Sequence, residues 1–240
     1  MRSGFRKFLI VIWLGLWPLL FWCLWTPIPF SALKIGASIA LCGLWIGAPL
    51  LFPRTRPLAA ISAMLALTLV FWPARPDSPR VLSREYGTAL QNYGGTRYLW
   101  GGENGRGIDC SGLVRRGMID ALLQRGWQTQ NPSLWREAAV IWWRDCSARE
   151  MKNGYSGRLE QRFEAPSLNG IDTSLLQTGD LAVMRSGVHV LAFVGEKGWI
   201  QADPNLSNGG DKVIFTRAPS KNGWFSQRAV ICRWKILDSR

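Results

Sequence analysis

Residues 108–114 read Ile-Asp-Cys-Ser-Gly-Leu-Val and join a glycine-rich loop to a segment with helical periodicity. The loop, residues 94–107, contains six glycines. Across 111–125 apolar side chains recur every three or four residues, and Gly126 follows. We therefore predict a helix that begins at Cys110 and ends at this glycine.

The position of Cys110 suits a nucleophile. Backbone N–H groups in the first turn of a helix have no partner within the helix, and together with the helix dipole they favour a thiolate over a thiol. The same groups can donate hydrogen bonds to an oxyanion that develops near the cysteine. Buried free cysteines are nevertheless common, so this position alone leaves a structural role open.

His189 is the only histidine in the chain, so any Cys–His mechanism must use it. Cysteine chemistry near neutral pH usually needs an imidazole that takes and returns a proton. Residues 187–194 alternate in the manner of a strand, with His189 on the same face as Leu191 and Phe193. On its own, this pattern is more typical of a histidine that packs beside the core.

Gln201 lies in the next predicted strand. A third polar group commonly accepts a hydrogen bond from the second nitrogen of a catalytic imidazole and fixes its tautomer. A neutral amide can do this, as asparagine does in papain-like sites. Asp203 would share the strand face with Gln201, so either side chain is a candidate for this role. An ordinary structural role, as a polar residue in a strand, is an equal alternative for Gln201.

The order of the predicted elements in the C-terminal part indicates an α+β fold. Helices are predicted over residues 83–92, 111–125 and 132–151, and residues 153–172 are polar and irregular. Five short strands follow, separated by turn residues, at 180–185, 188–194, 198–202, 213–216 and 229–235. Helices followed by an antiparallel set of strands are typical of an α+β domain.

The N-terminal third has the composition of a membrane region. No Asp or Glu precedes Asp77, whereas six Lys or Arg occur before residue 74. Uncharged runs occupy residues 8–25, 35–52 and 58–72; a spanning helix needs roughly 17–25 apolar residues, so the third run is short. A cleaved signal peptide would explain only the first run. We predict a membrane region at 1–73 with two or three transmembrane helices, a proline-rich linker at 74–82 and a domain at 83–240.

Positive charges in the short loops predict the orientation of these helices. Arg2, Arg6 and Lys7 precede the first run, Arg54 and Arg56 lie between the second and third, and Lys34 alone lies between the first and second. With three spans, the N-terminus is inside and the C-terminal domain is outside. If the third run does not span, the domain lies in the cytoplasm.

Composition argues against other classes of protein. The sequence has a single histidine and no CxxC pair, which argues against a zinc site with Cys and His ligands. It implies no cofactor. After residue 73, 23 Lys and Arg face 16 Asp and Glu, a net charge of +7, but these cations are scattered and no aromatic-basic motif of a nucleic-acid binder is present. Cys146 and Cys232 either pair in an oxidising compartment or remain free thiols.

Further motifs, taken together with the cysteine segment, resemble the NlpC-type family of bacterial cell-wall cysteine peptidases, a branch of the papain-like fold. They are Tyr98-Leu99-Trp100-Gly101-Gly102, Thr178-Gly179-Asp180-Leu181 and the histidine strand, in the family's order over about residues 85–215. The resemblance implies a papain-like domain with Cys110 as nucleophile on a helix and His189 as base on an antiparallel sheet. Gln201 falls where the family has a third polar residue, usually histidine.

The resemblance also implies residues that bind substrate. Tyr98 matches a tyrosine beside the nucleophile, and Asp109 and Ser111 match residues that help to hold a substrate amino group. A carboxylate beside a thiolate otherwise raises the pKa of the thiol, although capping of the helix explains Asp109 equally well. The interval from Cys110 to Gly179 is longer than the family usually needs; the helical insertion after residue 127 could overhang the groove and alter specificity, and its role is left open.

The expected function is hydrolysis of amide bonds in peptidoglycan stem peptides, at the D-glutamyl–diamino acid bond. The enzyme would be anchored in the lipid bilayer of a bacterial inner membrane, with its domain on the extracytoplasmic side. The positive charge suits anionic wall polymers or a membrane surface. One alternative is an amidase or acyltransferase of the same fold that acts on a lipid or another amide. The other is a non-catalytic module that binds cell wall or a partner protein; the sequence names no partner for the membrane helices.

Overall fold

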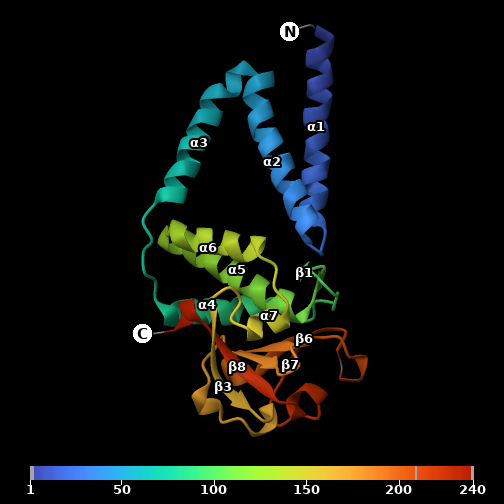
Figure 1. Cartoon of the computed structure of the whole chain (residues 1–240), viewed down its shortest axis with the longest axis vertical. Coiled ribbons are helices and arrows are strands. Elements are labelled where there is room, and N and C mark those ends of the chain that lie inside the picture. The colour runs from blue at the N-terminus through green and yellow to red at the C-terminus, as the bar shows by residue number, and fades with distance from the viewer. Residues whose placement is uncertain (1–2, 209, 239–240) are drawn as a thin grey trace. The chain divides into compact units, whose positions relative to one another are not determined.

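The computed structural model describes residues 3–208 and 210–238, and the chain divides into two compact units, Met1–Pro73 and Ala74–Arg240 (Figure 1). The first unit consists of apolar helices. They are α1 (Ser3–Trp25), α2 (Ser31–Leu51) and, after the short 3₁₀ turn η1 (Pro53–Thr55), α3 (Arg56–Phe71). Helix α3 begins ahead of the predicted apolar run, because Pro57 fits the first turn of a helix without needing an N–H.

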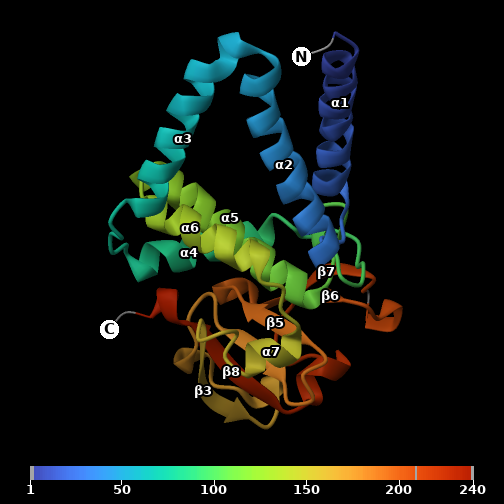
Figure 2. The ribbon, with the colours of Figure 1, turned by 45° about the horizontal axis from the view of Figure 1, so that its top comes forward.

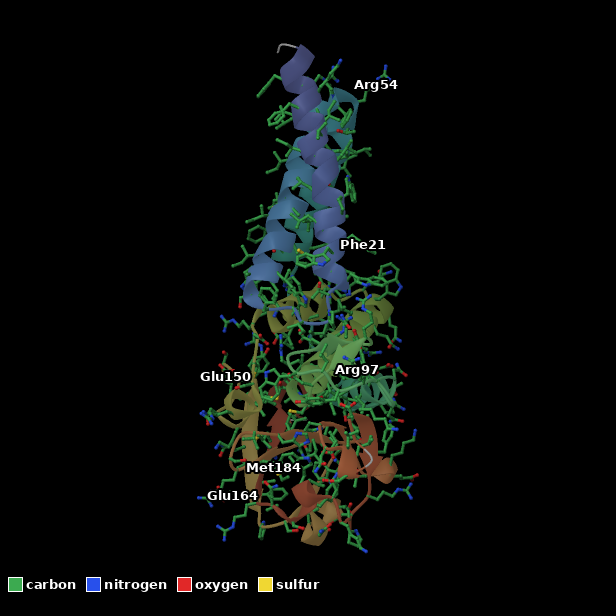
Figure 3. The ribbon with its side chains drawn as sticks, turned by 90° about the vertical axis from the view of Figure 1, so that its right-hand side faces the viewer. Phe21, Arg54, Arg97, Glu150, Glu164 and Met184 are labelled. Atoms are coloured by element: carbon green, nitrogen blue, oxygen red, sulfur yellow. The ribbon has the colours of Figure 1, made fainter. Side chains whose placement is uncertain are left out.

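Three segments of this unit are long and apolar enough to cross a membrane, namely Gly4–Trp25, Ser31–Leu51 and Pro53–Phe71. Side chains such as Phe21 project outward from the helices and are exposed (Figure 3). A helix satisfies its backbone hydrogen bonds internally, and an apolar outer surface is what lipid tails accept. These helices therefore fit a membrane anchor.

The second unit contains helices followed by a sheet. Its helices are α4 (Pro79–Gln91), α5 (Cys110–Thr129), α6 (Pro132–Trp143) and α7 (Ala148–Lys152). The small hairpin of β1 (Glu103–Asn104) and β2 (Gly107–Ile108) lies in the glycine-rich loop. The main strands are β3 (Leu159–Ala165), β4 (Leu181–Met184), β5 (Val190–Phe193), β6 (Trp199–Asp203), β7 (Lys212–Thr216) and β8 (Ala229–Trp234).

The six main strands form one antiparallel sheet in the order β3-β8-β4-β5-β6-β7. Helices α4, α5 and α6 lie together on one side of this sheet (Figures 1 and 2). The prediction of an α+β fold with an antiparallel sheet is therefore confirmed. The five predicted strands are present as β4 to β8, with ends that differ by at most two residues.

The sheet is buried on both faces, which explains why its central strands are apolar throughout. Residues of β4, β5 and β6 that face the helices pack into the main core with α4 and α5: Leu181, Val183, Val190, Ala192, Ile200 and Ala202. Their neighbours on the opposite face form a second cluster beneath the loops: Ala182, Met184, Leu191, Phe193 and Trp199. This two-sided burial fixes the register of the strands that carry the site.

The end of α5 differs from the prediction. The helix continues past Gly126 to Thr129 and ends at Gln130, which has a left-handed backbone (φ 48°, ψ 46°). A Cβ atom at Gly126 would come within 2.5 Å of Nε1 of Trp135 in α6. Gly126 therefore permits the close approach of two helices and does not end one of them.

The predicted helix over 132–151 is two helices, so this prediction was wrong. The chain leaves the helical conformation after Trp143, and α7 starts a new turn at Ala148. Ser147 caps α7, because its hydroxyl accepts from the Glu150 N–H (3.3 Å) while the Glu150 carboxylate accepts from the Ser147 N–H (2.7 Å). This reciprocal capping box favours a fresh helix start over a continuous helix.

Strand β3 was not predicted, because residues 153–172 look polar and irregular. Among the strands that the structure describes, it pairs with β8 alone at the edge of the sheet, and a bulge between Gln161 and Phe163 interrupts its alternation. Only Leu159 and Ala165 of β3 are buried. Charged side chains such as Glu164 point into solvent (Figure 3) and protect the exposed edge from pairing with another chain.

All five cysteines are free thiols. Of the two alternatives for Cys146 and Cys232, the structure thus has both residues reduced. Both are buried, and burial raises the pKa of Cys232 to about 12 and also raises the pKa of Cys146. Cys146 lies between α6 and α7 and Cys232 lies within β8, whereas Cys110 is the first residue of α5, so among these three only Cys110 has the position at a helix start that suits a nucleophile.

Candidate active site

Cys110 is the first residue of α5, and Asp109 caps this helix. Oδ1 of Asp109 accepts hydrogen bonds from the Gly112 N–H (2.6 Å) and the Ser111 hydroxyl (2.9 Å). Oδ2 accepts from the Gly101 N–H in the glycine-rich loop (2.8 Å). The carboxylate therefore holds the loop and the helix end together and fixes the backbone on both sides of the cysteine.

The thiol of Cys110 is nearly enclosed, with 7% of the residue exposed. Burial raises the pKa of this thiol to about 12, and the Asp109 carboxylate adds to the increase. Hydrogen bonds from the backbone N–H groups of Val190 and Ser111 act in the opposite direction but are outweighed. The start of a helix favours a thiolate, but burial outweighs this effect, so the expected resting thiolate is corrected: the thiol stays protonated at neutral pH.

His189 lies immediately before β5, on the turn that follows β4. Its carbonyl accepts from the Met184 N–H (2.9 Å), which closes the turn. The residue after it, Val190, is the one whose N–H contacts the Cys110 sulfur. The pairing of β4 with β5, together with the packing of α5 on β5, therefore brings the histidine segment to the N-terminal end of α5.

The imidazole of His189 is buried and its Nε2 atom lies 2.7 Å from Oε1 of Gln201. An amide oxygen only accepts hydrogen bonds, so Nε2 carries the proton and Nδ1 is the basic nitrogen. Burial lowers the pKa of His189 to about 4, while the Gln201 hydrogen bond and the Asp203 charge raise it in part. Gln201, and not Asp203, is the direct partner of the ring.

Trp224 covers the imidazole of His189. Their ring centroids are 4.2 Å apart and their planes differ by 15°. Trp224 belongs to the 3₁₀ turn η6 (Gly223–Ser226) and was missed in the sequence, because nothing local in a turn between strands indicates a contact with a residue 35 positions earlier. The indole shields one face of the base from water.

Asp203 has a different role from the one considered for it. Its carboxylate is fully buried and accepts from the Asn205 N–H (2.9 Å), the Asn222 side-chain amide (2.8 Å) and the Trp224 indole N–H (3.4 Å). Asn222 in turn accepts from the Trp224 backbone N–H (3.1 Å). Asp203 thus holds the turn that carries Trp224, and it reaches His189 through its charge.

Tyr98 is half-buried beside the same site. Its backbone N–H donates to the Asp211 carbonyl (2.8 Å), and the residue forms a parallel bridge with Ile108. Burial raises the pKa of Tyr98, and the nearby Asp109 and Asp203 carboxylates add to the increase. The phenol is therefore protonated at neutral pH and is a hydrogen-bond donor next to the thiol.

An ion cluster around Arg115 was also missed; Arg115 and Glu103 are buried, whereas the Asp145 carboxylate is largely exposed. Nη1 of Arg115 lies 2.9 Å from Glu103 and 2.7 Å from Asp145, and Nη2 donates to the Ile141 carbonyl (2.8 Å). Glu103 belongs to the glycine-rich loop, and Asp145 and Ile141 belong to the helical insertion. Arg115 therefore ties the loop, the cysteine helix and the insertion together.

The described residues contain no group of three His, Cys, Asp or Glu side chains placed to hold a metal ion. The chemistry available at the site is that of a buried thiol, a buried neutral imidazole oriented by an amide, a phenol, and the backbone N–H groups at the start of a helix. Such groups suit proton transfer coupled to attack on a carbonyl carbon.

A cysteine at the start of a helix, packed against an antiparallel sheet that carries a histidine and its amide partner, defines the class of papain-like α+β domains. Within that class, the model of the NlpC/P60 family matches residues 95–230, which is more than half of the chain, and the chain belongs to this family. Members are generally cell-wall peptidases and amidases. No curated protein matches the chain. Tyr98, Cys110, His189 and Gln201 all lie within the matched residues.

Proposed function

We propose that the protein is a membrane-anchored cysteine endopeptidase that hydrolyses amide bonds in peptidoglycan stem peptides. Cys110 is the nucleophile, His189 the general base and acid, and Gln201 the residue that orients the imidazole. The observation that carries the proposal is the 2.7 Å contact between Nε2 of His189 and Oε1 of Gln201, which leaves Nδ1 as the base. Membership of the NlpC/P60 family supports the reaction class.

The reaction begins when the Cys110 proton passes to Nδ1 of His189 and the sulfur attacks the amide carbonyl. A C–S bond forms and the carbonyl oxygen becomes an oxyanion, for which backbone N–H groups at the start of α5 are donors. The C–N bond then breaks as His189 returns the proton to the leaving amine. Water, deprotonated by His189, attacks the thioester and releases Cys110.

The two pKa values describe the resting state of this pair. With Cys110 raised to about 12 and His189 lowered to about 4, both groups are neutral at pH 7. Charge therefore develops only during attack, in a site from which water is largely excluded. A buried site of this kind stabilises developing charge through fixed donors and not through solvent.

Membership of the NlpC/P60 family supports peptidoglycan stem peptides as the substrate class, and the proposed bond is the D-glutamyl–diamino acid bond. Tyr98, Asp109 and Ser111 are proposed to bind the substrate next to this bond. Asp109 already accepts three hydrogen bonds, and a carboxylate offers about four acceptor positions. A substrate ammonium would thus be its fourth partner, in addition to its capping role.

The membrane region is proposed to anchor the domain on the extracytoplasmic side of a bacterial inner membrane. Three candidate spans, together with the cations before α1 and around η1, support this orientation. The same neighbouring spans favour one other function, acyl transfer or hydrolysis on a lipid amide by the same residues. Both functions use the same thioester, so only the substrate distinguishes them.

The test uses the full chain in detergent micelles with muropeptides of known structure, and the products are identified by mass spectrometry. Cleavage of the stem peptide should be lost in Cys110→Ala and His189→Ala and kept in Cys42→Ala, which removes a cysteine of α2. If the wild-type chain leaves muropeptides intact but cleaves lipid amides, the lipid function replaces the proposal. If neither is cleaved and a thiol probe labels Cys110 slowly, the domain is a binding module.

A further inference from the structure

The turn that presents His189 lies on the surface of the domain. Residues 185–188 connect β4 to β5, and most of this turn is exposed. The Gly187 N–H donates to the Met184 carbonyl (2.7 Å), and the Arg185 N–H donates to the Arg228 carbonyl (2.9 Å). Exposed turns are ordinarily among the mobile parts of a protein, so a turn that presents the proposed base needs further support to keep its geometry.

Helix α7 contacts this turn at two points. The ammonium group of Lys152 donates a hydrogen bond to the Arg185 carbonyl (2.7 Å). At Gly187 the approach is so close that a Cβ atom there would lie 2.9 Å from Cβ and 3.0 Å from Cα of Arg149. Gly187 also has a left-handed backbone (φ 76°), which favours glycine. The two contact points lie four and two residues before His189 in the chain.

Helix α7 is itself held on several sides, although it has only five residues. Met151 is fully buried in the main core. The Lys152 carbonyl accepts from the Gln161 side-chain amide in β3 (2.7 Å), and the capping box of Ser147 and Glu150 closes the first turn. A short helix that is packed and capped in this way can act as a fixed support for the turn.

The residues just before α7 contact the helix that begins with Cys110. Oδ1 of Asp145 accepts from Nη1 of Arg115 (2.7 Å) and from the Cys146 N–H (3.0 Å). Arg115 lies five residues after Cys110 on α5. Segment 145–152 therefore contacts the helix of the proposed nucleophile at one end and the turn of the proposed base at the other. It belongs to the insertion after residue 127, whose role the sequence left open.

We propose that Arg149 and Lys152 are positioning residues for the reaction. By holding the turn, they keep the imidazole of His189 in place relative to the Cys110 sulfur. The inference rests on the proposed function, because it takes His189 as the base for Cys110. Proton transfer needs the two groups within hydrogen-bond reach, and a displacement of about 1 Å can lower a rate by about 10²-fold.

The test measures the rate at which iodoacetamide alkylates Cys110 at pH 7, with the full chain in detergent micelles. Iodoacetamide reacts with the thiolate, so this rate reports how well His189 takes the Cys110 proton, without any substrate. The exposed Cys42 is the internal reference, and mass spectrometry of peptides separates the two sites. The variant His189→Ala gives the rate without the base. Values of kcat and KM on one defined muropeptide are measured in parallel.

Replacement of Gly187 should disturb the positioning without touching the reacting groups. The methyl group of Gly187→Ala would collide with Arg149 and force the turn away from α7. Alkylation of Cys110 and kcat should both fall by at least about tenfold, because a displaced imidazole takes the proton less well, whereas KM should change little.

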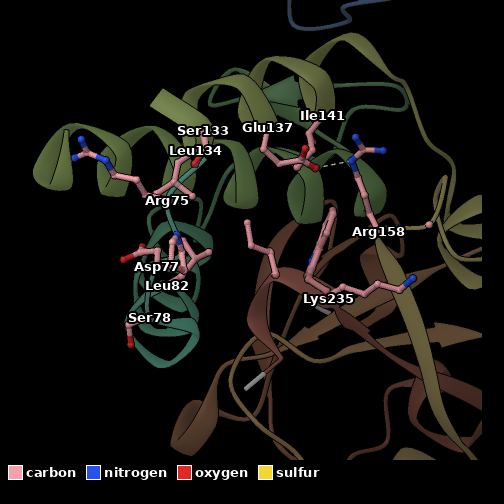
Figure 4. A pocket seen from close by; sticks show the side chains of 14 residues that line it. Arg75, Asp77, Ser78, Leu82, Ser133, Leu134, Glu137, Ile141, Arg158 and Lys235 are labelled. Atoms are coloured by element: carbon pink, nitrogen blue, oxygen red, sulfur yellow. Dashed lines mark hydrogen bonds and ion pairs between the residues drawn. The ribbon is translucent and has the colours of Figure 1, made fainter. Parts of the chain in front are cut away.

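Gly157→Ala is the matched control for backbone strain. Gly157 has a similar left-handed backbone (φ 81°), but a Cβ atom there meets nothing within 4 Å. It borders a cavity that Ser78, Glu137 and Lys235 also line, and none of these residues belongs to the proposed site (Figure 4). Both glycine variants should lower the urea midpoint of unfolding, because both strain the backbone. Only Gly187→Ala should slow alkylation and cleavage.

A second pair of variants tests the hydrogen bond from Lys152. Lys152→Met removes the donor to the Arg185 carbonyl and keeps an unbranched side chain, so alkylation and kcat should fall several-fold. Lys152→Arg keeps a donor and should recover part of both rates. This pair decides the inference if Gly187→Ala does not fold.

The outcomes separate the positioning role from the proposed function. Wild-type alkylation rates in Gly187→Ala and Lys152→Met, or equal slowing in Gly157→Ala, would overturn the positioning role and leave the base assigned to His189. An unchanged rate in His189→Ala would overturn the base and the positioning role together. If the wild-type chain leaves muropeptides intact while the Gly187 and Lys152 variants slow alkylation, the positioning role is supported and the proposed substrate is overturned.

Discussion

The indole of Trp224 lies parallel to the imidazole of His189, with ring centroids 4.2 Å apart. The imidazole is thus covered on one face by Trp224 and held at its edge by Gln201. The first contact excludes water from the ring, and the second selects its tautomer. These two effects are separable, and variants of the two residues should change different properties of the proposed peptidase.

Replacement of Trp224 should change the pH dependence of the reaction. In Trp224→Ala, water reaches His189 and relieves the burial that lowers its pKa to about 4, so the pKa rises towards 6.5. His189 must be neutral to act as a base, so the acid limb of kcat/KM should move to higher pH by about one unit. Trp224→Phe keeps an aromatic cover and should shift the limb less. An identical pH profile for Trp224→Ala would contradict this role.

Replacement of Gln201 should lower kcat with little change in KM. Gln201→Leu removes the acceptor for the Nε2 proton, so Nδ1 is no longer held as the base; we expect a loss of about 10²-fold, within the range that general acid–base catalysis contributes. Gln201→His supplies a ring nitrogen as acceptor and should recover part of the activity. Steady-state kinetics on one defined muropeptide distinguish these outcomes, and full activity of Gln201→Leu would remove Gln201 from the mechanism.

The neutral, buried His189 should make the folded domain sensitive to acid. The pKa of this group is about 4 when folded and about 6.5 when unfolded, so its contribution to stability is complete above pH 6.5 and is lost as the pH falls towards 4. The loss amounts to about 3 kcal/mol at most. Unfolding by urea at pH 7 and pH 4.5 should therefore show a smaller pH dependence in His189→Gln than in the wild type. Equal pH dependence in both proteins would show that His189 is not buried as a neutral ring.

Removal of Arg115 should destabilise the domain strongly. Arg115→Met leaves the buried Glu103 carboxylate without its 2.9 Å partner, and breaking a buried pair in this way costs about 3–5 kcal/mol. Arg116→Met is the matched control, because the Arg116–Asp120 pair is partly exposed and should contribute about 1 kcal/mol or less. Urea unfolding of both variants in detergent measures the difference. Similar losses in the two variants would contradict the special role of the buried Arg115–Glu103 pair.

The sequence predicted the parts of the site that depend on local pattern. The glycine-rich loop followed by helical periodicity located Cys110, and strand alternation placed His189 and Gln201 on neighbouring strands, which the structure pairs through β5 and β6. Features that depend on contacts between distant segments could not be found in this way. Trp224 stacks on His189 from a turn 35 residues further along the chain, and Glu103 contacts Arg115 only when the loop folds onto α5.

Local sequence pattern also placed two helix boundaries wrongly. Gly126 looked like a helix end, yet a side chain there would collide with Trp135. Similarly, the apolar periodicity of 132–151 continued across a break that Ser147 and Glu150 impose by hydrogen bonding. In the first case the packing of two helices explains the glycine, and in the second a capping box sets the boundary between two helices.

The ion pair between Arg125 and Asp77 fixes the place where the chain enters the C-terminal unit. Cys110 and Arg125 lie fifteen residues apart on α5, which corresponds to about 22 Å along the helix. Because Arg125 holds Asp77 through two hydrogen bonds, the chain enters the C-terminal unit beside the last turns of α5, at the opposite end of this helix from Cys110. In the anchored peptidase proposed above, the length of α5 would thus separate the linker from the nucleophile, so a substrate could reach Cys110 without displacing the linker.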